Sequence, residues 1–208
     1  MKKLLFLLCF IISIHAFGQH TWTEGTLHLN NGIVKKGLII FPQVSKDLIL
    51  FPKKQRVLFK ANKKAKKEKY DHKNVEKVVF INADKEAEEY IYIPVSKKRH
   101  ELFKKIVEGK ATLYSRIVAY TEGSSGEQEL SFTDDFVMTD LNDYGEFYVL
   151  REGEKIASPL ITLRLSRSFK KRAMEYFSDC PEIVAKLKDK TFRQEDIKEV
   201  VTMYNQCN

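Results

Sequence analysis

The stretch Ser168–Asn208 reads SFKKRAMEYFSDCPEIVAKLKDKTFRQEDIKEVVTMYNQCN and decides the C-terminal part of the fold. Its apolar residues recur at helical spacing in three runs, so each run predicts an amphipathic helix. Pro181 suits the first turn of the second helix, because its missing N–H would have no intrahelical partner there. The apolar positions are Phe169, Ala173, Met174, Tyr176 and Phe177 in the first run, Ile183, Val184 and Leu187 in the second, and Ile197, Val200, Val201 and Tyr204 in the third.

Two cysteines bracket the second and third of these helices. Cys180 directly precedes Pro181, and Cys207 follows the third run. An antiparallel pair of helices brings these two positions to the same side, where the Cα separation of a disulfide, roughly 5.5 Å, can be met. The sequence therefore predicts a disulfide between Cys180 and Cys207. The alternative is two unpaired thiols, one of them buried.

The N-terminus has the three parts of an export signal. Met1-Lys2-Lys3 is a short basic start, and Leu4–Ile14 is apolar but too short to span a bilayer. Ala16-Phe17-Gly18 supplies the small residues of a cleavage site, so residues 1–18 are expected to be a signal peptide. Cleavage removes Cys9 and leaves an even number of cysteines. We expect a periplasmic or secreted protein with no transmembrane segment after cleavage.

Composition predicts a folded and moderately basic protein. The chain is 43% hydrophobic and 12% aromatic, which supplies a sizeable core and argues against wholesale disorder. Loss of Lys2 and Lys3 with the signal lowers the formal net charge from +8 to +6 (+8 − 2). Such a charge favours attraction to an anionic surface, but it identifies no partner.

Residues 19–96 have the turn signals and the composition of short antiparallel strands. Thr21–Phe41 predicts a hairpin, because Asn31-Gly32 accepts the positive φ angles of a tight turn. Four more short runs, mostly rich in β-branched and aromatic residues, follow. We expect a small antiparallel barrel or roll in this part of the chain. The four runs are Asp47–Phe51, Arg56–Phe59, Val75–Ile81 and Glu89–Val95.

Residues 97–165 predict one short helix and then further strands. His100–Val107 carries three apolar residues at helical spacing, and Gly109 would end the helix. Ala111–Tyr120 alternates as a strand does. With the helices of residues 166–208, this order predicts an α+β fold. A second hairpin is expected from Phe147–Leu150 and Ile156–Leu163.

One run of the sequence is unusually rich in lysine. Lys60–Lys69 holds six lysines in ten residues, too many to pack in a core. The candidate anion-contacting residues are Lys63, Lys64, Lys66 and Lys67, and an anionic envelope surface or an anionic glycan is the partner that they suggest. The alternative is a solvated loop. The run argues against nucleic acid as the partner, because it has no arginine or aromatic residue for base contacts.

Motifs for metal binding or catalysis are weak. Asp140–Gly145 partly resembles a calcium-binding loop, but Tyr144 and Arg151 stand where oxygen ligands are needed. The histidines outside the signal show no metal-ligand spacing, and there is no Gly-x-Ser-x-Gly motif. We therefore assign no catalytic residue, no metal ligand and no cofactor from the sequence.

Four stretches together carry a resemblance. They are GTLHLNNG (residues 25–32) with Lys36-Gly37, FKKIVEGKATLY (103–114), YFSDCPEIV (176–184) and YNQC (204–207). On these stretches the chain resembles uncharacterised exported proteins of the Bacteroidota, over most of its length after the signal. The resemblance implies export and a helical C-terminus, and it implies no activity, ligand or catalytic residue.

Two functions from different classes follow. The first is an exported, non-catalytic binding or envelope-associated protein. The second is a hydrolase or transferase that acts on cell-envelope material. A pocket with convergent polar groups and perturbed carboxylates would favour the enzyme, and an exposed binding surface would favour the first function.

Overall fold

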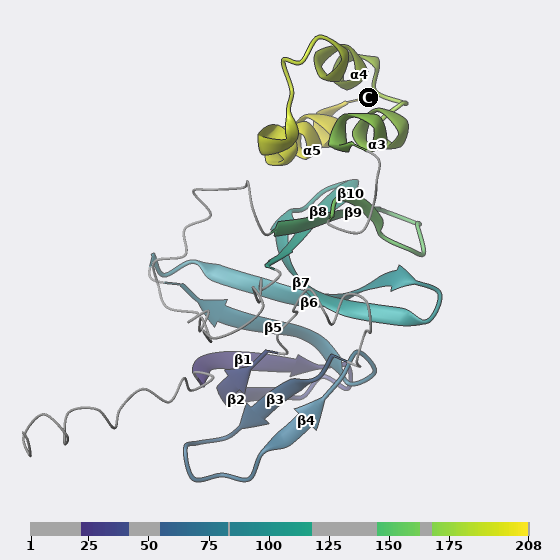
Figure 1. Cartoon of the computed structure of the whole chain (residues 1–208). Helices are drawn as coiled ribbons and strands as arrows, with labels where there is room; N and C mark the ends of the chain where they lie inside the picture. The colour runs from purple at the N-terminus through teal and green to yellow at the C-terminus, as the bar shows by residue number, and fades with distance from the viewer. Residues whose placement is uncertain (1–21, 42–54, 83, 118–144, 163–167, 208) are drawn as a thin grey trace, which may run out of the picture.

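The structure is a computed structural model that describes residues 22–41, 55–82, 84–117, 145–162 and 168–207 (Figure 1). The described strands form one antiparallel sheet in the order β10-β9-β8-β7-β6-β5-β1-β2-β3-β4. The strands are β1 (Thr23–Leu29), β2 (Val34–Ile40), β3 (Val57–Lys60), β4 (Glu68–Tyr70), β5 (Val75–Ile81), β6 (Ala87–Ser96), β7 (Arg99–Val107), β8 (Ala111–Ile117), β9 (Gly145–Arg151) and β10 (Ser158–Ile161). The helices are α3 (Phe169–Tyr176), α4 (Pro181–Lys188), the 3₁₀ helix η2 (Gln194–Asp196) and α5 (Ile197–Gln206).

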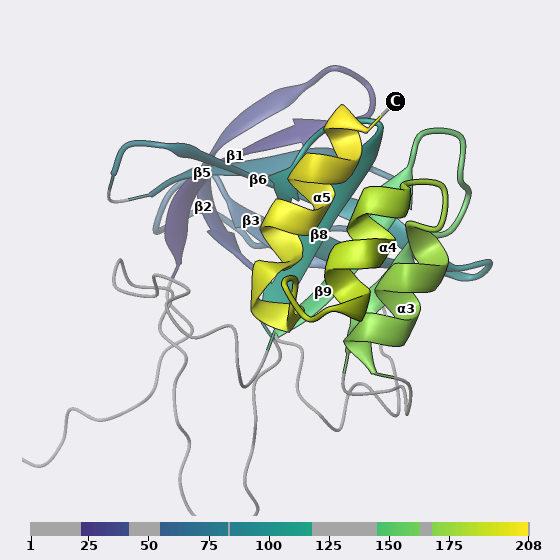
Figure 2. The ribbon, with the colours of Figure 1, turned by 90° about the horizontal axis from the view of Figure 1, so that it is seen from above.

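The C-terminal helices cover one face of the β8–β10 end of the sheet. Figure 2 shows α3, α4 and α5 side by side over β8 and β9. Their apolar stripes bury Phe177, Leu187 and Val200 against Leu113 and Val149 of the sheet. The three predicted helices are thus confirmed, and one core joins them to the strands.

The central strands bury apolar residues on both faces. Leu102 and Phe103 are consecutive in β7, so they point to opposite faces. Leu102 belongs to a core built with β1, β2, β3 and β5, whereas Phe103 belongs to a separate core with β6, β8 and β9. Gln55 accepts from the Tyr92 hydroxyl at 3.2 Å, and the Ala157 N–H donates to the Pro94 carbonyl at 2.8 Å.

The helix predicted for His100–Val107 is wrong, because this segment lies in strand β7. Burial of both faces explains the error: Leu102 and Phe103 are both buried, so the run lacks the alternation of a one-faced strand. A register shift between Lys105 and Val107 disturbs the alternation further. The apolar spacing then resembles that of a helix.

The predicted closed barrel does not form. The sheet is open and ends at β4 and β10. Both edge strands are short, and each has a feature that discourages further pairing. β10 contains Pro159, which has no N–H to donate, and β4 begins within the lysine run and carries Lys69. The expected boundary between residues 96 and 97 lies where β6 passes into the β6–β7 turn, and Ser96 pairs with Arg99 there.

The other predicted strands can be compared with the described part of the chain. The hairpin of Thr21–Phe41 is confirmed as β1 and β2, with Gly32 at a φ of 81° in its turn. The second hairpin is confirmed as β9 and β10. The predicted strand Asp47–Phe51 and the signal peptide lie outside the described residues. Within the described ranges, no helix is long and apolar enough to cross a membrane.

Candidate functional site

The lysine run forms the turn of the β3–β4 hairpin. Asn62 organises this turn: its carbonyl accepts from the Ala65 N–H at 3.1 Å, and its side-chain Oδ1 accepts from the Lys64 N–H at 3.0 Å. Asparagine is favoured at this first position of a turn for that reason. Lys63 and Lys64 occupy the two central positions. The candidate residues Lys63, Lys64, Lys66 and Lys67 are all exposed, and the structure brings them together on one turn.

The one acidic residue of the hairpin is already bonded elsewhere. Glu68 accepts from Lys35 Nζ at 2.6 Å and from the Tyr70 hydroxyl at 2.5 Å. The Lys35 hydrogen bond, followed by that of Tyr70, lowers the pKa of Glu68, so this carboxylate is charged near neutral pH. Lys35 also lies 5.5 Å from the ring centroid of Phe59. Glu68 and its partners therefore lie on the face of the hairpin that packs toward the core.

The opposite face of the hairpin carries lysines. Lys60 pairs with Leu38 of β2, and Lys69 pairs with Leu58, which is two residues before Lys60 in β3. Side chains of paired residues, and of residues two apart in a strand, lie on the same face. Lys36, two residues before Leu38 in β2, is therefore on this face too. Lys36 and Lys69 are exposed. Lys60 Nζ lies 4.6 Å from the ring centroid of Trp22. In the part of the chain that the structure describes, no side-chain ion pair involves any of the four turn lysines.

Gly37 lets the hairpin approach β2 closely. A Cβ at this position would lie 2.3 Å from the Lys60 carbonyl oxygen and 2.8 Å from Phe59 Cζ. Because the nearest atom is backbone, a side chain at this position would displace β3. Gly37 thus fixes how the lysine-rich hairpin is attached to the sheet.

The two cysteines form the predicted disulfide. Cys180 is the N-cap of α4 and Cys207 is the C-cap of α5, and their Cα atoms are 6.2 Å apart. Cys180 is fully buried, and Cys207 packs against the same core. The sequence prediction is confirmed, and the bond closes the pair formed by α4 and α5.

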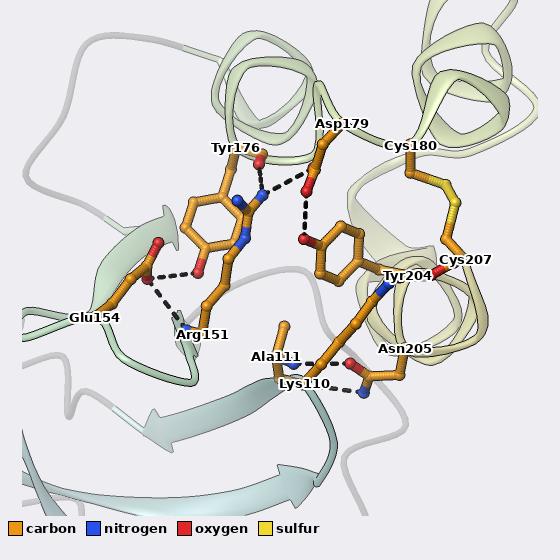
Figure 3. Close-up of polar contacts among 10 residues, drawn as sticks. All are labelled: Lys110, Ala111, Arg151, Glu154, Tyr176, Asp179, Cys180, Tyr204, Asn205 and Cys207. Carbon is orange, nitrogen blue, oxygen red and sulfur yellow. Dashed lines mark hydrogen bonds and ion pairs between the residues drawn. A yellow bond between two sulfur atoms is a disulfide. The ribbon is translucent and has the colours of Figure 1, made fainter.

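A polar cluster beside the disulfide joins the helices to the β9–β10 turn (Figure 3). Arg151 stacks between two tyrosines, with Cζ 4.4 Å from the ring centroid of Tyr176 and 4.9 Å from that of Tyr204. Its guanidinium donates to the Tyr176 carbonyl and, at 3.0 Å, to Asp179. Asp179 also accepts from the Tyr204 hydroxyl at 2.7 Å, and Glu154 accepts from the Tyr176 hydroxyl at 2.7 Å.

Asn205 and Lys110 make a second junction, with the β7–β8 turn. The Ala111 N–H donates to Asn205 Oδ1 at 2.8 Å, and Asn205 Nδ2 donates to the Ala111 carbonyl at 3.0 Å. Lys110 donates to the Cys207 carbonyl, and its Nζ lies 4.6 Å from the Tyr204 ring centroid. A Cβ at position 109 would lie 2.4 Å from the Asn205 side chain, so a larger residue than Gly109 would displace Asn205.

The cluster has the chemistry of a structural junction. Burial, and then the hydrogen bond to Asp179, raises the pKa of Tyr204 to about 12. Burial opposes ionisation of Asp179, but the hydrogen bond from Tyr204 and the charge of Arg151 leave its pKa lowered. Neither group exchanges a proton near neutral pH, which general acid–base catalysis would require. The stretches SDCP and YNQC thus have a role in holding the helices on the sheet.

A buried charge cluster was missed by the sequence reasoning. The Arg116 guanidinium stacks 4.6 Å from the Phe103 ring centroid, bonds Glu146 at 2.8 Å through Nε, and pairs with Glu101. The three charged side chains are at most 6% exposed. Glu146 also accepts from the Thr162 hydroxyl. The residues come from β7, β8, β9 and the segment after β10, so no local spacing in the sequence could have revealed the cluster.

Two histidines meet although they share no motif. The rings of His72 and His100 stack, with centroids 4.5 Å apart and ring planes 4° from parallel. No group of three or more metal-ligating residues occurs in the described ranges. Asp140–Gly145, the stretch that partly resembles a calcium loop, lies outside those ranges.

The hairpin is far from the disulfide along the sheet. β3 and β4 form one edge, whereas the helices pack on β8–β10 at the other (Figure 1). Comparisons of the chain with family models, with curated proteins and with solved structures found no match. The resemblance to exported proteins of the Bacteroidota therefore stays a prediction from the sequence.

Proposed function

We propose that the chain is an exported, non-catalytic protein of the cell envelope that binds its partner at a surface. The export signal in residues 1–18 and the cysteine pair support a periplasmic or secreted location. The observation that carries the binding function is the β3–β4 turn, where Lys63, Lys64, Lys66 and Lys67 are exposed and close together. The charge of this turn is available to an anionic partner.

The alternative is a hydrolase or transferase acting on cell-envelope material. The buried carboxylates of Glu101 and Glu146 are the observation that favours it, because buried acids are often catalytic. Both carboxylates, however, bind the guanidinium of Arg116, which offsets part of their charge inside the sheet. The binding function is therefore the better supported of the two.

Fractionation of cells that express the full chain tests the proposal. We expect the envelope fraction to contain a form that begins at Gln19, and we expect high salt to release it, because screening weakens contacts between exposed charges. Intact mass and N-terminal sequencing identify the form. An envelope form that retains Met1 would contradict export. A mature form that stays in the soluble fraction at low salt would contradict surface binding.

A further inference from the structure

We propose that the β3–β4 hairpin, with the adjoining face of β2, docks on a membrane surface of anionic phospholipid. This inference rests on the proposed function and names the partner class of the same site. The docking surface consists of the exposed turn lysines Lys63, Lys64, Lys66 and Lys67 together with the strand lysines Lys36, Lys60 and Lys69. We call this set the lysine face.

The arrangement of charge favours an extended anionic surface as the partner. Glu68 is the one acid in β3 or β4, and it is turned toward Lys35 and Tyr70 on the other side of the hairpin. Glu24 of β1 is exposed and lies opposite Leu38, so one acid shares this side of the sheet, and the seven lysines of the lysine face leave the surface net positive. Polybasic surfaces of this kind are attracted to anionic lipid by about 1 kcal/mol, or roughly fivefold in affinity, for each lysine near the membrane.

The type of cation points to the same partner. The run Lys60–Lys69 contains no arginine, whose planar fork recognises a single carboxylate or phosphate with fixed geometry. Lysine ammonium groups act as point charges on flexible stems, which suits many headgroups at variable positions. Trp22 lies beneath Lys60, and tryptophan favours the boundary between headgroups and acyl chains.

The hairpin presents these lysines on an ordered support. The turn is held by two hydrogen bonds to Asn62, and Gly37 allows β3 to lie close against β2. Lys63 and Lys64 contribute their charged side chains without a bond to the rest of the described chain. Their substitution should therefore change binding and leave folding intact.

The structure offers a matched control for charge. Lys97 and Lys98 are also exposed and also occupy a short turn between two paired strands, β6 and β7. The variants K63E/K64E and K97E/K98E change the net charge by the same amount. Any difference between them reports the position of the lysines, since the total charge is equal.

Co-sedimentation with vesicles tests the proposal, using mature protein (Gln19–Asn208). We expect binding to vesicles of phosphatidylglycerol and phosphatidylcholine, loss of binding on pure phosphatidylcholine, and weakening as salt rises above about 0.1 M. K63E/K64E should weaken binding by at least about 25-fold, which is fivefold for each lysine. K97E/K98E should change it by no more than about twofold, because Lys97 and Lys98 belong to the β6–β7 turn and not to the lysine face. Circular dichroism should give both variants the melting temperature of the wild type.

Three results would overturn the inference. Equal weakening by the two variants would show that net charge alone is responsible. Equal binding to neutral vesicles would show that lipid charge is irrelevant. Binding to a soluble anionic polysaccharide such as polygalacturonate, with none to the vesicles, would assign the lysine face to a glycan. The last result removes the lipid and leaves the proposed envelope function standing, which the fractionation experiment tests separately.

Discussion

Asn205 forms two hydrogen bonds with the backbone of Ala111, which is 94 residues away in the chain. The pair joins the last turn of α5 to the first residue of β8. Together with Lys110 and the Cys180–Cys207 disulfide, it fixes the helical segment on the sheet (Figure 3). The C-terminal stretch is thus held at its end as well as by its apolar stripes.

Replacement of Asn205 by Ala should lower the free energy of unfolding by about 1–3 kcal/mol, because partly buried polar groups of Ala111 lose their partners. Urea denaturation measures the change. Gln206→Ala is the matched control, since Gln206 is exposed on the same turn of α5 and should cost less than about 0.5 kcal/mol. Equal effects of the two substitutions would show that the junction with Ala111 contributes nothing.

Loss of the disulfide should loosen the C-terminus first. The bond closes a loop with a sequence separation of 27, and loops of this size typically contribute about 2–4 kcal/mol. The double variant C180S/C207S should therefore unfold at lower denaturant. Hydrogen exchange should show α4 and α5 losing protection before the central strands. Uniform loss of protection across the sheet and the helices would contradict this order.

Replacement of Arg116 by Met should be among the most damaging single substitutions. It leaves Glu101 and Glu146 buried without their cation, and breaking a buried pair in this way costs about 3–5 kcal/mol. Arg99→Met is the control. Arg99 also pairs with Glu101, but at the longer distance of 3.6 Å and with a side chain that is 35% exposed, so this substitution should cost below about 1 kcal/mol. Chemical denaturation compares the two. Similar costs would mean that the buried cluster is not a unit.

Stability should fall as the pH drops below the ordinary pKa of histidine. Burial, followed by the neighbouring His72, lowers the pKa of His100. The folded protein then binds fewer protons than the unfolded chain. The stability contributed by neutral His100 is therefore complete above about pH 6.5 and is lost as the pH falls below that value. Melting temperatures at about pH 7.5 and about pH 5.5 should differ more for the wild type than for His100→Gln. Identical pH dependence would exclude His100 as the source.

A second acid-dependent contribution lies in a separate range. Hydrogen bonds from Lys105 and then Lys77 lower the pKa of Glu89 to about 2. Its contribution is therefore present above the ordinary glutamate pKa and disappears only as the pH falls from there toward 2. Glu89→Gln should flatten the stability profile in that acid range and leave the range between pH 5.5 and 7.5, about where histidine titrates, as in the wild type.

The parts of the fold that could be predicted are those in which one face is buried. Val200 and Tyr204 lie on a single stripe of α5, and Asn31-Gly32 forms the turn that its residues favour. The disulfide could be predicted because Cys180 begins α4 and Cys207 ends the neighbouring helix α5. In each case the signal is local or depends on simple helix geometry.

The parts that could not be predicted depend on contacts between distant strands. Leu102 and Phe103 enter different cores, which hides the strand period of β7 and led to the wrong helix. Arg116 and Glu146 face each other because β8 and β9 pair. No local pattern in the sequence predicts this pairing. At the candidate site, the exposure of Lys63 follows from composition, but the inward orientation of Glu68 follows only from the pairing of β3 and β4.

Retention in the envelope tests most directly the central claim, that the exported protein binds the envelope through its lysine-rich hairpin. Cells expressing the wild type, K63E/K64E or K97E/K98E are fractionated, the envelopes are washed at low salt, and the mature protein remaining in each is quantified. The account predicts retention of the wild type and of K97E/K98E, and release of K63E/K64E. Equal retention of all three proteins would contradict it.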